Sequence, residues 1–401
     1  MKFIYKAAQT DGRIAEGIME AQNESDALAQ IARLGLKPLF LKQEKKIRLA
    51  NFFAGKRITL EDKVFVTKYL SLMLKVGTDL FKAIDILIED FDKPSVKALL
   101  MEIRENLEKG RPFYTTFSKY PKVFSPVFVN LIRSGEVSGN LERVFEELSV
   151  SLEKERELNQ KIKSSLTYPV ILFFASVIIL VLLVSFSLPK IANVFLSGGI
   201  EPPTFSRIVF SVGLFIGGNL GWLLPMFFII SVGTILFFIK TVPGKSMLYT
   251  IALRVPVIRQ IIKQLSLQRF ASTLSSLLSS GIPIVEAIDI TASSVGMPEL
   301  EQALNRISRE GIAKGLTVGE AFRKEPVFPK VVANLVAVSE KSGHLEEILK
   351  TLAGFYTGEI ESSVKSLVAF IEPVMLFMIG IVIGTIALAI IVPVYQLTSS
   401  F

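Results

Sequence analysis

Three long runs of apolar residues without internal charge dominate the hydrophobic pattern of the chain: residues 169–188, 208–239 and 373–397. Each run reaches the roughly 20 residues that a helix needs to cross ~30 Å of hydrocarbon, so the pattern predicts three transmembrane helices. The second run, of about 32 residues, forms a helix of roughly 48 Å, which is too long for one upright span and too short for two spans with a turn.

Basic residues flank these runs asymmetrically. Lys154, Arg156, Lys161 and Lys163 precede the first run, and Lys240, Lys245, Arg254, Arg259 and Lys263 follow the second. Because positive charge marks the cytoplasmic side of a membrane protein, a single crossing by the second run keeps both clusters inside. The sequence therefore predicts a multi-pass inner-membrane protein with a cytoplasmic N-terminus and an external C-terminus.

Outside the apolar runs, the chain repeats itself. The segment GTDLFKAIDIL from Gly77 matches GIPIVEAIDIT from Gly281, which sets an offset of 204 residues. The same offset relates Glu136 to Glu340, Pro169 to Pro373 and Pro189 to Pro393, with one local gap near Gly110 and Gly315. Each half is thus predicted to be a helical cytoplasmic unit followed by a span, and the middle span is an insertion that returns the chain to the cytoplasm.

The last helix of each half carries a heptad-like apolar seam with a glutamate, Glu155 or Glu359, in its middle. The first seam is Leu141, Phe145, Leu148, Leu152, Glu155, Asn159, Ile162 and Leu166. This spacing predicts a packed helix that continues to the membrane. There, Pro169 and Pro373 predict a kink, because proline removes a backbone hydrogen bond at a cost of ~3 kcal/mol. Simple tolerance of proline near the interface is the alternative.

The first sixty residues stand outside the repeat and predict short strands at 3–8, 13–20 and 38–42 with a helix near 25–34. The predicted fold class is an all-α membrane protein: two duplicated cytoplasmic helical bundles and three transmembrane helices, with a small α+β N-terminal region. The predicted order is the N-terminal region at 1–44, a basic linker at 45–60, bundle 1 at 61–167, transmembrane helix 1 at 168–189, an outer loop at 190–207, transmembrane helix 2 with an extension at 208–239, bundle 2 at 240–371 and transmembrane helix 3 at 372–397.

Composition excludes several kinds of chemistry. The chain has no cysteine and one histidine, His344, which excludes thiol chemistry, zinc–thiolate sites and histidine metal clusters. Gly244-Lys245-Ser246 resembles part of a phosphate-binding loop, but Ile239 stands where that loop needs a glycine. With no other catalytic motif, we expect no enzyme and no cofactor. The net charge of +8 fits a face beside anionic membrane lipid, not nucleic acid.

Two glycine patterns occur in the apolar runs at four-residue spacing. They are Gly213, Gly217 and Gly221 in the second run and Gly380 and Gly384 in the third. Small residues at this spacing let membrane helices approach closely, either within one chain or between protomers or with a helix of another protein. Charged residues are absent deep within the runs, which counts against an ion-coupled transporter.

The turn before each long helix recurs as GEVSGNLE from Gly135 and SEKSGHLEE from Ser339, and an FxxxxxNL segment precedes each, from Phe124 and Phe328. The turn residues singled out are Gly135, Glu136, Ser138 and Gly139 in the first copy and Glu340, Ser342 and Gly343 in the second. Over nearly the entire chain the pattern resembles the type II secretion system protein F family, which type IV pilus platform proteins share. Ser339 departs from the glycine that the family usually has there.

The resemblance implies an inner-membrane platform, which we expect to be a homo-oligomer of a size that the sequence does not define. Its bundles would contact a hexameric assembly ATPase and other inner-membrane assembly proteins, and its spans would help deliver pilin or pseudopilin subunits into the filament. A membrane transporter component and a passive membrane scaffold are the alternatives. Pilus assembly, secretion and DNA uptake all remain open.

We predict further that Glu136 and Glu340 organise equivalent turns, each accepting hydrogen bonds from backbone amides or from a helix start. A surface carboxylate that docks the ATPase or a divalent cation is the functional alternative for these two residues.

Overall fold

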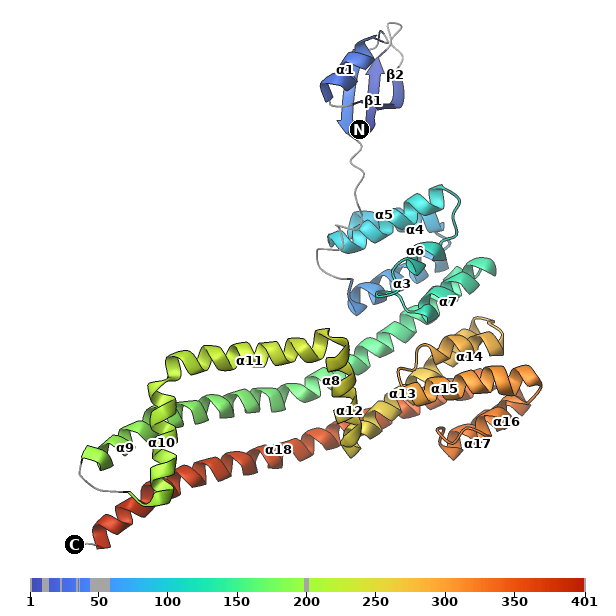
Figure 1. Ribbon diagram of the computed structural model, residues 1–401. Helices are drawn as coiled ribbons and strands as arrows, with labels where there is room; N and C mark the ends of the chain where they lie inside the picture. The colour runs from blue at the N-terminus through green and yellow to red at the C-terminus, as the bar shows by residue number, and fades with distance from the viewer. Residues whose placement is uncertain are drawn as a thin grey trace. The chain divides into compact units, whose positions relative to one another are not determined.

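The computed structural model describes residues 2–8, 14–21, 24–33, 35, 37–43, 58–197 and 202–399 (Figure 1). The predicted basic linker lies outside the described residues up to position 57, as do residues 198–201 of the predicted outer loop. The chain divides into two compact units, Met1–Thr59 with Phe81–Lys109, and Leu60–Leu80 with Gly110–Phe401. Residues 81–109, which the prediction placed in bundle 1, therefore belong to the first unit.

The first unit contains the small sheet and two helices of the first repeat. Strand β1 (Lys2–Ala8) pairs antiparallel with both β2 (Ile14–Glu20) and β3 (Lys37–Gln43), which gives the order β2-β1-β3. Helix α1 spans Glu24–Arg33. These elements lie within two residues of the predicted positions. Helices α4 (Leu80–Asp90) and α5 (Pro94–Glu108) follow, and α5 buries Val96, Leu99, Leu100 and Ile103 at helical spacing.

The second unit is helical throughout its described residues. Its elements are α3 (Leu60–Lys75), α6 (Tyr114–Ser118), α7 (Pro126–Val137), α8 (Leu141–Leu182), η1 (Leu183–Ser187), α9 (Leu188–Ser197), α10 (Thr204–Gly218), α11 (Leu220–Lys240), α12 (Val242–Arg254), α13 (Pro256–Ser279), α14 (Ile284–Ala292), α15 (Pro298–Arg306), η2 (Ile307–Gly311), η3 (Ile312–Lys314), α16 (Val318–Arg323), α17 (Lys330–Ser342) and α18 (Leu345–Ser399). The predicted helical, duplicated fold class is confirmed.

The duplication is visible in the helix boundaries. Helices α5 and α15 begin with Pro94 and Pro298, and α8 and α18 begin with Leu141 and Leu345, in each case 204 residues apart. The local gap also has a structural counterpart. The π-helical turn η2 follows α15, where α5 of the first copy continues as an α-helix. Because a π turn accommodates one residue more than an α turn, η2 absorbs an insertion of a single residue.

A cluster of phenylalanine rings forms the same part of the core in both repeats. In the first copy Phe117 packs on Phe124 and Phe128, with ring centroids 5.0 and 5.3 Å apart. In the second copy Phe322 packs on Phe328 at 4.9 Å. These rings are buried, so each repeat is held together by aromatic packing that the sequence pattern alone does not locate.

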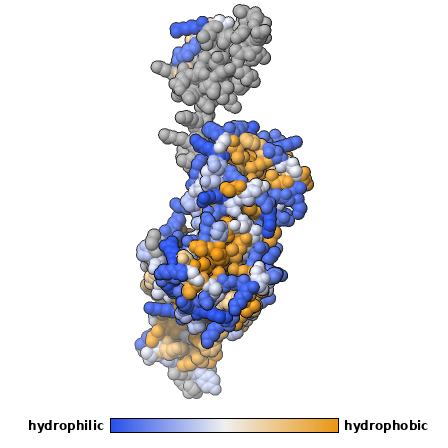
Figure 2. All heavy atoms as spheres, turned by 90° about the vertical axis from the view of Figure 1, so that its right-hand side faces the viewer, coloured by the Kyte–Doolittle hydropathy of each residue, from blue (hydrophilic) through white to orange (hydrophobic). Residues whose placement is uncertain are grey.

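Three helices of the described chain are long and apolar enough to cross a membrane, within Leu141–Phe195, Leu220–Phe238 and Leu345–Tyr395. By length and composition, the number of such helices agrees with the predicted number of spans. Their large apolar side chains are mostly exposed, as lipid-facing side chains should be. Elsewhere the surface is mixed, and Figure 2 shows hydrophobic areas bordered by hydrophilic side chains on one face of the molecule.

The long second apolar run is not one helix, which corrects the prediction for 208–239. The helix breaks at Asn219, where φ is −113° and ψ is 13°, and α10 and α11 lie on either side. Helix α11, with 21 residues, is about 32 Å long and matches the hydrocarbon thickness. Helix α10, with 15 residues, is about 22 Å long and too short to span. Because of this break, only α11 is long enough to span the membrane, and the remaining residues of the apolar run form the separate helix α10.

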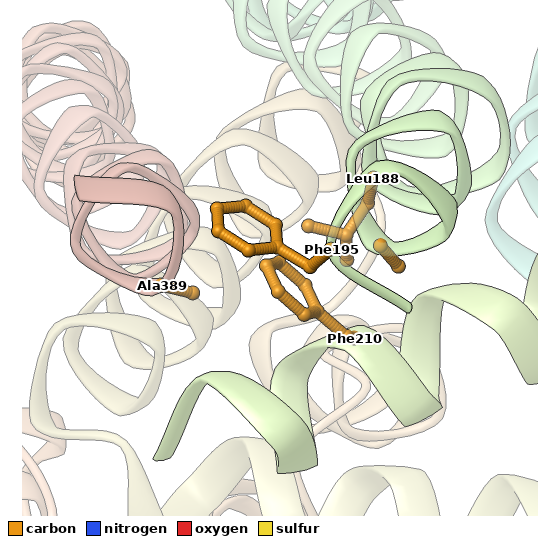
Figure 3. Close-up of a cluster of buried hydrophobic side chains, with 5 residues drawn as sticks. Leu188, Phe195, Phe210 and Ala389 are labelled. Atoms are coloured by element: carbon orange, nitrogen blue, oxygen red, sulfur yellow. The ribbon is translucent and has the colours of Figure 1, made fainter. Parts of the chain in front are cut away.

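The first span also differs from the prediction, because its helix does not end near Pro189. It continues through the π turn η1 into α9, which contains residues 190–197 of the predicted outer loop. Leu188 and Phe195 of α9 pack with Phe210 of α10 and Ala389 of α18 in a buried cluster (Figure 3). The rings of Phe195 and Phe210 stack, with centroids 5.8 Å apart. This cluster fixes α9 and α10 against the third span.

Candidate functional site

The two repeat-related glutamates, Glu136 and Glu340, bind backbone amides in the same way. The Glu136 carboxylate accepts hydrogen bonds from the Phe113 N–H at 2.6 Å and from the Tyr114 N–H at 3.1 Å. The Glu340 carboxylate accepts from the Val318 N–H at 2.6 Å and the Gly319 N–H at 2.8 Å. Each side chain therefore satisfies amides at the start of a short helix, α6 or α16.

The amides that these carboxylates satisfy precede α7 and α17 in the chain and do not belong to the long helices. Each glutamate thus ties the end of α7 or α17 back to an earlier helix start. Because both oxygens of each carboxylate already accept a backbone hydrogen bond, the geometry favours the turn-organising hypothesis over direct binding of a cation.

The remaining turn residues close the ends of α7 and α17. Gly139 and Gly343 have φ of +70° and +75°, a backbone conformation that glycine adopts without strain. The Asn140 N–H donates to the Gly135 carbonyl at 2.7 Å, and the His344 N–H donates to the Ser339 carbonyl at 3.0 Å. These bonds form a Schellman-type ending that reverses the chain into the long helix.

The serines of the turn act locally. The Ser138 hydroxyl donates to the Gly135 carbonyl at 3.4 Å, and the Ser342 hydroxyl donates to the Ser339 carbonyl at 3.2 Å. Gly135 has a steric role, because a Cβ at this position lies 2.7 Å from Cγ2 of Val144. The second copy accommodates a side chain there, since Ser339 is buried and donates to the Val336 carbonyl at 3.0 Å.

Helices α8 and α18 contact each other between the helical repeats and the apolar segments, from Leu158 to Tyr168 of α8. Leu158 of the first repeat packs with Ile360 and Val364 of the second in a buried cluster. Leu158 lies outside the predicted heptad seam, whose Glu155 and Asn159 are exposed. The seam prediction is therefore wrong at Glu155 and Asn159, whereas Ile162 of the predicted seam does pack on this cluster.

Two polar contacts between α8 and α18 follow, and the second lies beside Pro169 and Pro373. The Lys161 ammonium lies 2.7 Å from the Glu361 carboxylate. Further on, the Tyr168 hydroxyl donates to Glu372 at 3.3 Å, so two repeat-equivalent positions meet directly beside Pro169 and Pro373. Both helices continue through these prolines, α8 to Leu182 and α18 to Ser399. The prolines lie at a point where the two repeats are joined and are not helix ends.

A cavity of about 550 Å³ with a mixed polar and apolar lining lies between α8, α13 and α18. Its charged lining residues are Arg143, Lys154, Lys161 and Lys350, and Glu146, Glu147, Glu157, Glu346 and Glu361. Four serines of α13 also line it, together with apolar and neutral polar residues of all three helices; the serines are Ser272, Ser275, Ser276 and Ser279. Such a mixed lining is typical of an interface between domains that can shift relative to each other, whereas a domain core is lined by apolar side chains.

At the edge of this cavity, hydrogen bonds join the two repeats. The Ser134 hydroxyl donates to the Ser280 carbonyl at 2.9 Å, and the Ser280 hydroxyl donates to Glu147 at 3.1 Å. Burial raises the pKa of the Glu147 carboxyl, although the Ser280 hydroxyl and Arg143 act in the opposite direction. Glu147 is thus a carboxylate whose charged form the interface tolerates poorly.

A second cavity, of about 420 Å³, lies between the same repeats and is lined by Lys63 of α3, Glu155 of α8 and polar residues of α13. The Lys63 ammonium donates to the Val123 carbonyl at 3.2 Å. Burial lowers the pKa of Lys63, and the nearby Glu155 carboxylate partly offsets that effect. Within the described residues, no group of three or more His, Cys, Asp or Glu side chains is arranged to bind a metal ion.

The structure separates the predicted packing glycines into two groups. A Cβ at Gly213 lies 2.5 Å from Cδ2 of Leu188, and a Cβ at Gly217 lies 2.8 Å from Cγ of Pro189, so these two glycines let α10 approach η1 and α9. By contrast, Gly221, Gly380 and Gly384 have no such neighbour within 4 Å in the described chain.

The sequence pattern described as "Type II secretion system (T2SS), protein F" matches residues 66–189 and 270–393. A second pattern, "Type II secretion system protein F, N-terminal domain", matches residues 1–42. The two matches of the first pattern begin 204 residues apart, in the register of the structural repeat.

Similar proteins cover almost the whole chain. A type IV pilus assembly protein PilC of Thermus thermophilus is 32% identical over 98% of this chain and 97% of its own length. A type IV pilus assembly protein PilC of Pseudomonas aeruginosa is 28% identical over 92% of this chain and 98% of its own length. A type II secretion system protein F of the same organism is 25% identical, with 98% of both chains covered.

Proposed function

Because this chain belongs to the type II secretion system protein F family, we propose that it is the inner-membrane platform of a type IV pilus or type II secretion machine. In this proposal it catalyses no reaction itself and couples the movement of a hexameric cytoplasmic ATPase to the insertion of pilin or pseudopilin into the filament. Other inner-membrane assembly proteins complete the machine, and the platform acts as a homo-oligomer. The repeats are cytoplasmic, with the N-terminus inside and the C-terminus outside.

The observation that carries the proposal is the continuity of α8 and α18, each of which begins in a helical repeat and ends in a span. Their 42 and 55 residues correspond to rods of about 63 and 82 Å. A force applied to either repeat is transmitted along such a helix, and Pro169 or Pro373, which lacks one backbone hydrogen bond, is the place where the helix can bend.

The polar interface between the repeats supports the same proposal. The cavities beside α8 are lined by charged and hydroxyl side chains, which water can solvate when the repeats shift. The small apolar cluster around Leu158 and Ile360 joins the two rods lower down. The two repeats can therefore move against each other above a fixed point near the membrane, which converts a rotation or tilt into movement of the spans.

Deletion of the gene, with imaging of filaments and immunodetection of pilin, tests the proposal. Loss of filaments with pilin still present supports the platform function. Normal filaments with altered uptake of a solute would instead support a transporter component, and normal filaments without any change would support a passive scaffold.

A disulfide that locks the two repeats tests the coupling. The pair Ser134→Cys and Ser280→Cys replaces a direct inter-repeat contact in a chain that has no native cysteine. Under oxidising conditions we expect filament assembly to stop, and under reducing conditions it should recover, while each single variant assembles normally. Assembly at the wild-type rate by the fully oxidised double variant would refute movement between the repeats.

A further inference from the structure

Helix α12 (Val242–Arg254) joins the apolar helix α11 to the second repeat, and it lies outside both matches of the duplicated pattern. The apolar part of α11 ends at Phe238, and α12 begins four residues later. The two helices run crosswise to each other (Figure 1). With α11 crossing the membrane, as the proposed function requires, a helix crosswise to it runs along the membrane surface.

Local contacts fix the turn between α11 and α12. The Thr241 hydroxyl accepts a hydrogen bond from the Gly244 N–H at 3.1 Å and donates one to the Phe237 carbonyl at 2.7 Å. A Cβ at Gly244 would collide with the Phe237 carbonyl oxygen. The face of α12 that carries Gly244 is therefore turned towards α11, which is the side on which the chain enters the bilayer.

This face continues along α12 as an apolar stripe. Leu248, Ile251 and Val255 follow Gly244 at intervals of four, three and four residues, which is the spacing of one helix face. Met247 lies beside them. We call Met247, Leu248, Ile251 and Val255 the α12 stripe, and their side chains are 54%, 50%, 44% and 39% exposed. The protein itself thus leaves much of the stripe uncovered.

The other side of α12 packs on the protein, where Tyr249, Ala252 and Leu253 are half-buried. The helix is therefore apolar on two sides, and the protein covers only one of them. Because the uncovered stripe is turned towards the bilayer, the boundary of the hydrocarbon region is the apolar surface that it meets.

Basic residues surround the stripe, and no acidic residue of the same stretch balances them. From Pro202 to Val285 the chain has no aspartate or glutamate. Residues 240–269 alone supply six of the eight net positive charges of the chain. Five of these basic residues are exposed close to α12 and form no ion pair with a described residue; they are Lys240, Lys245, Arg254, Arg259 and Lys263. Such a segment attracts anionic headgroups.

We propose that α12 is an interfacial helix whose stripe inserts at the level of the lipid headgroups and whose basic residues bind the phosphates of anionic phospholipids. Lys245 and Arg254 lie on opposite edges of the stripe, where long side chains reach the headgroups while the stripe remains in the apolar layer. An acidic surface of a partner protein would match the charges, but it would leave the stripe that faces the bilayer unexplained.

This contact with lipid determines where the second repeat begins. Helix α13 starts directly after the stripe, and its Ile261 packs on the buried cluster of Leu158, Ile360 and Val364. Anchoring α12 therefore holds this cluster close to the membrane surface. The inference rests on the membrane placement in the proposed function, and it does not depend on which motor or filament subunit the platform serves.

Single cysteines with a fluorescent label test the placement of α12, since the native chain has no cysteine. The full chain is placed in lipid nanodiscs, which leave both membrane faces open to iodide, a quencher in water. A label at Ile251→Cys should be quenched by lipids with brominated chains and protected from iodide. Phe228→Cys on α11, where the native side chain is 68% exposed, is the control for contact with lipid. Ser246→Cys, on an exposed polar side of α12, is the control for contact with water.

The same Ile251→Cys label measures which lipid is bound. Brominated phosphatidylglycerol or brominated phosphatidylcholine is added as a minor component of neutral nanodiscs. Since a lysine or arginine at an anionic surface contributes about a fivefold gain in affinity, the anionic lipid should be preferred by at least about threefold. High salt should remove this preference, because it screens charges at the surface.

Charge variants locate the bound lipid. Adding Lys245→Gln and Arg254→Gln should reduce the preference for phosphatidylglycerol by at least about twofold. Lys314→Gln with Arg323→Gln is the matched control, because it removes the same charge from exposed positions of the second repeat and should leave the preference unchanged.

The Phe228 label separates failure of this inference from failure of the proposed function. If the Phe228 label is in lipid and iodide quenches the Ile251 label as strongly as the Ser246 label, the inference alone is wrong. If the Phe228 label is itself open to iodide, α11 does not span and both are wrong. Equal quenching of the Ile251 label by the two brominated lipids, or an equal loss of preference in the control variant, would also overturn the binding of anionic lipid by α12.

Discussion

Replacing Glu136 by alanine removes the acceptor of two backbone hydrogen bonds that close the first repeat. The Phe113 N–H lies 2.6 Å from the carboxylate and belongs to a buried residue, so water reaches it less readily than an exposed amide. The Tyr114 N–H, at 3.1 Å, is only partly buried and can be solvated. Hydrogen bonds to charged groups contribute roughly 1.5–3 kcal/mol each. Since water replaces the acceptor of the second bond, only the first bond is fully lost, and we expect Glu136→Ala to lower the free energy of unfolding by about 1.5–3 kcal/mol.

Two companion variants sharpen this expectation. Glu136→Gln keeps one carbonyl oxygen and should lose only about 1–2 kcal/mol. Glu340→Ala should lose at least as much as Glu136→Ala, because the two amides that Glu340 binds lie at 2.6 and 2.8 Å. Glu89→Ala, on an exposed position of α4, is the control and should change the free energy of unfolding by less than about 0.5 kcal/mol.

The measurement uses the full chain in detergent, in which the urea concentration that makes the repeats susceptible to trypsin reports the free energy of unfolding. Co-purification of the cognate ATPase provides the functional readout. A Glu136→Ala change of less than about 0.5 kcal/mol would refute the reasoning from the hydrogen bonds. A fully stable Glu136→Ala chain that no longer retains the ATPase would assign the carboxylate to docking.

Three further perturbations act elsewhere. Alanine at Pro169 and Pro373 should leave stability unchanged or raised yet impair filament assembly, and wild-type assembly by a normally inserted double variant would contradict a mechanical role. Gly217→Leu should reduce the abundance of the inserted protein, because a Cβ there lies 3.0 Å from the Ser185 carbonyl, whereas Gly384→Leu should not. The raised pKa of Glu147 means that the folded state retains a proton which the unfolded state has lost, so stability should fall as pH rises above the ordinary glutamate range. Glu147→Gln should remove that pH dependence, and an unchanged urea–pH profile would count against a buried, poorly tolerated charge.

The sequence by itself determined the features that depend on local pattern. A helix needs about 20 apolar residues to cross a bilayer, so three uncharged runs predicted three spans, whatever the remainder of the chain does. The offset of 204 residues between Gly77 and Gly281 determined the duplication, because equivalent residues form equivalent turns. The importance of Glu136 and Glu340 followed from their repetition beside glycines that end helices, although the amides that they bind lie more than twenty residues earlier.

Only the tertiary structure decided which surfaces meet. Leu158 was outside the predicted seam because periodicity describes one helix face, whereas this residue packs against Ile360 of the other repeat. The helix that continues past Pro189 is held by the packing of Phe195 with Phe210 and the third span, which no local preference encodes. Burial and pairing are properties of residues distant in sequence, so they arise only when the helices are placed together.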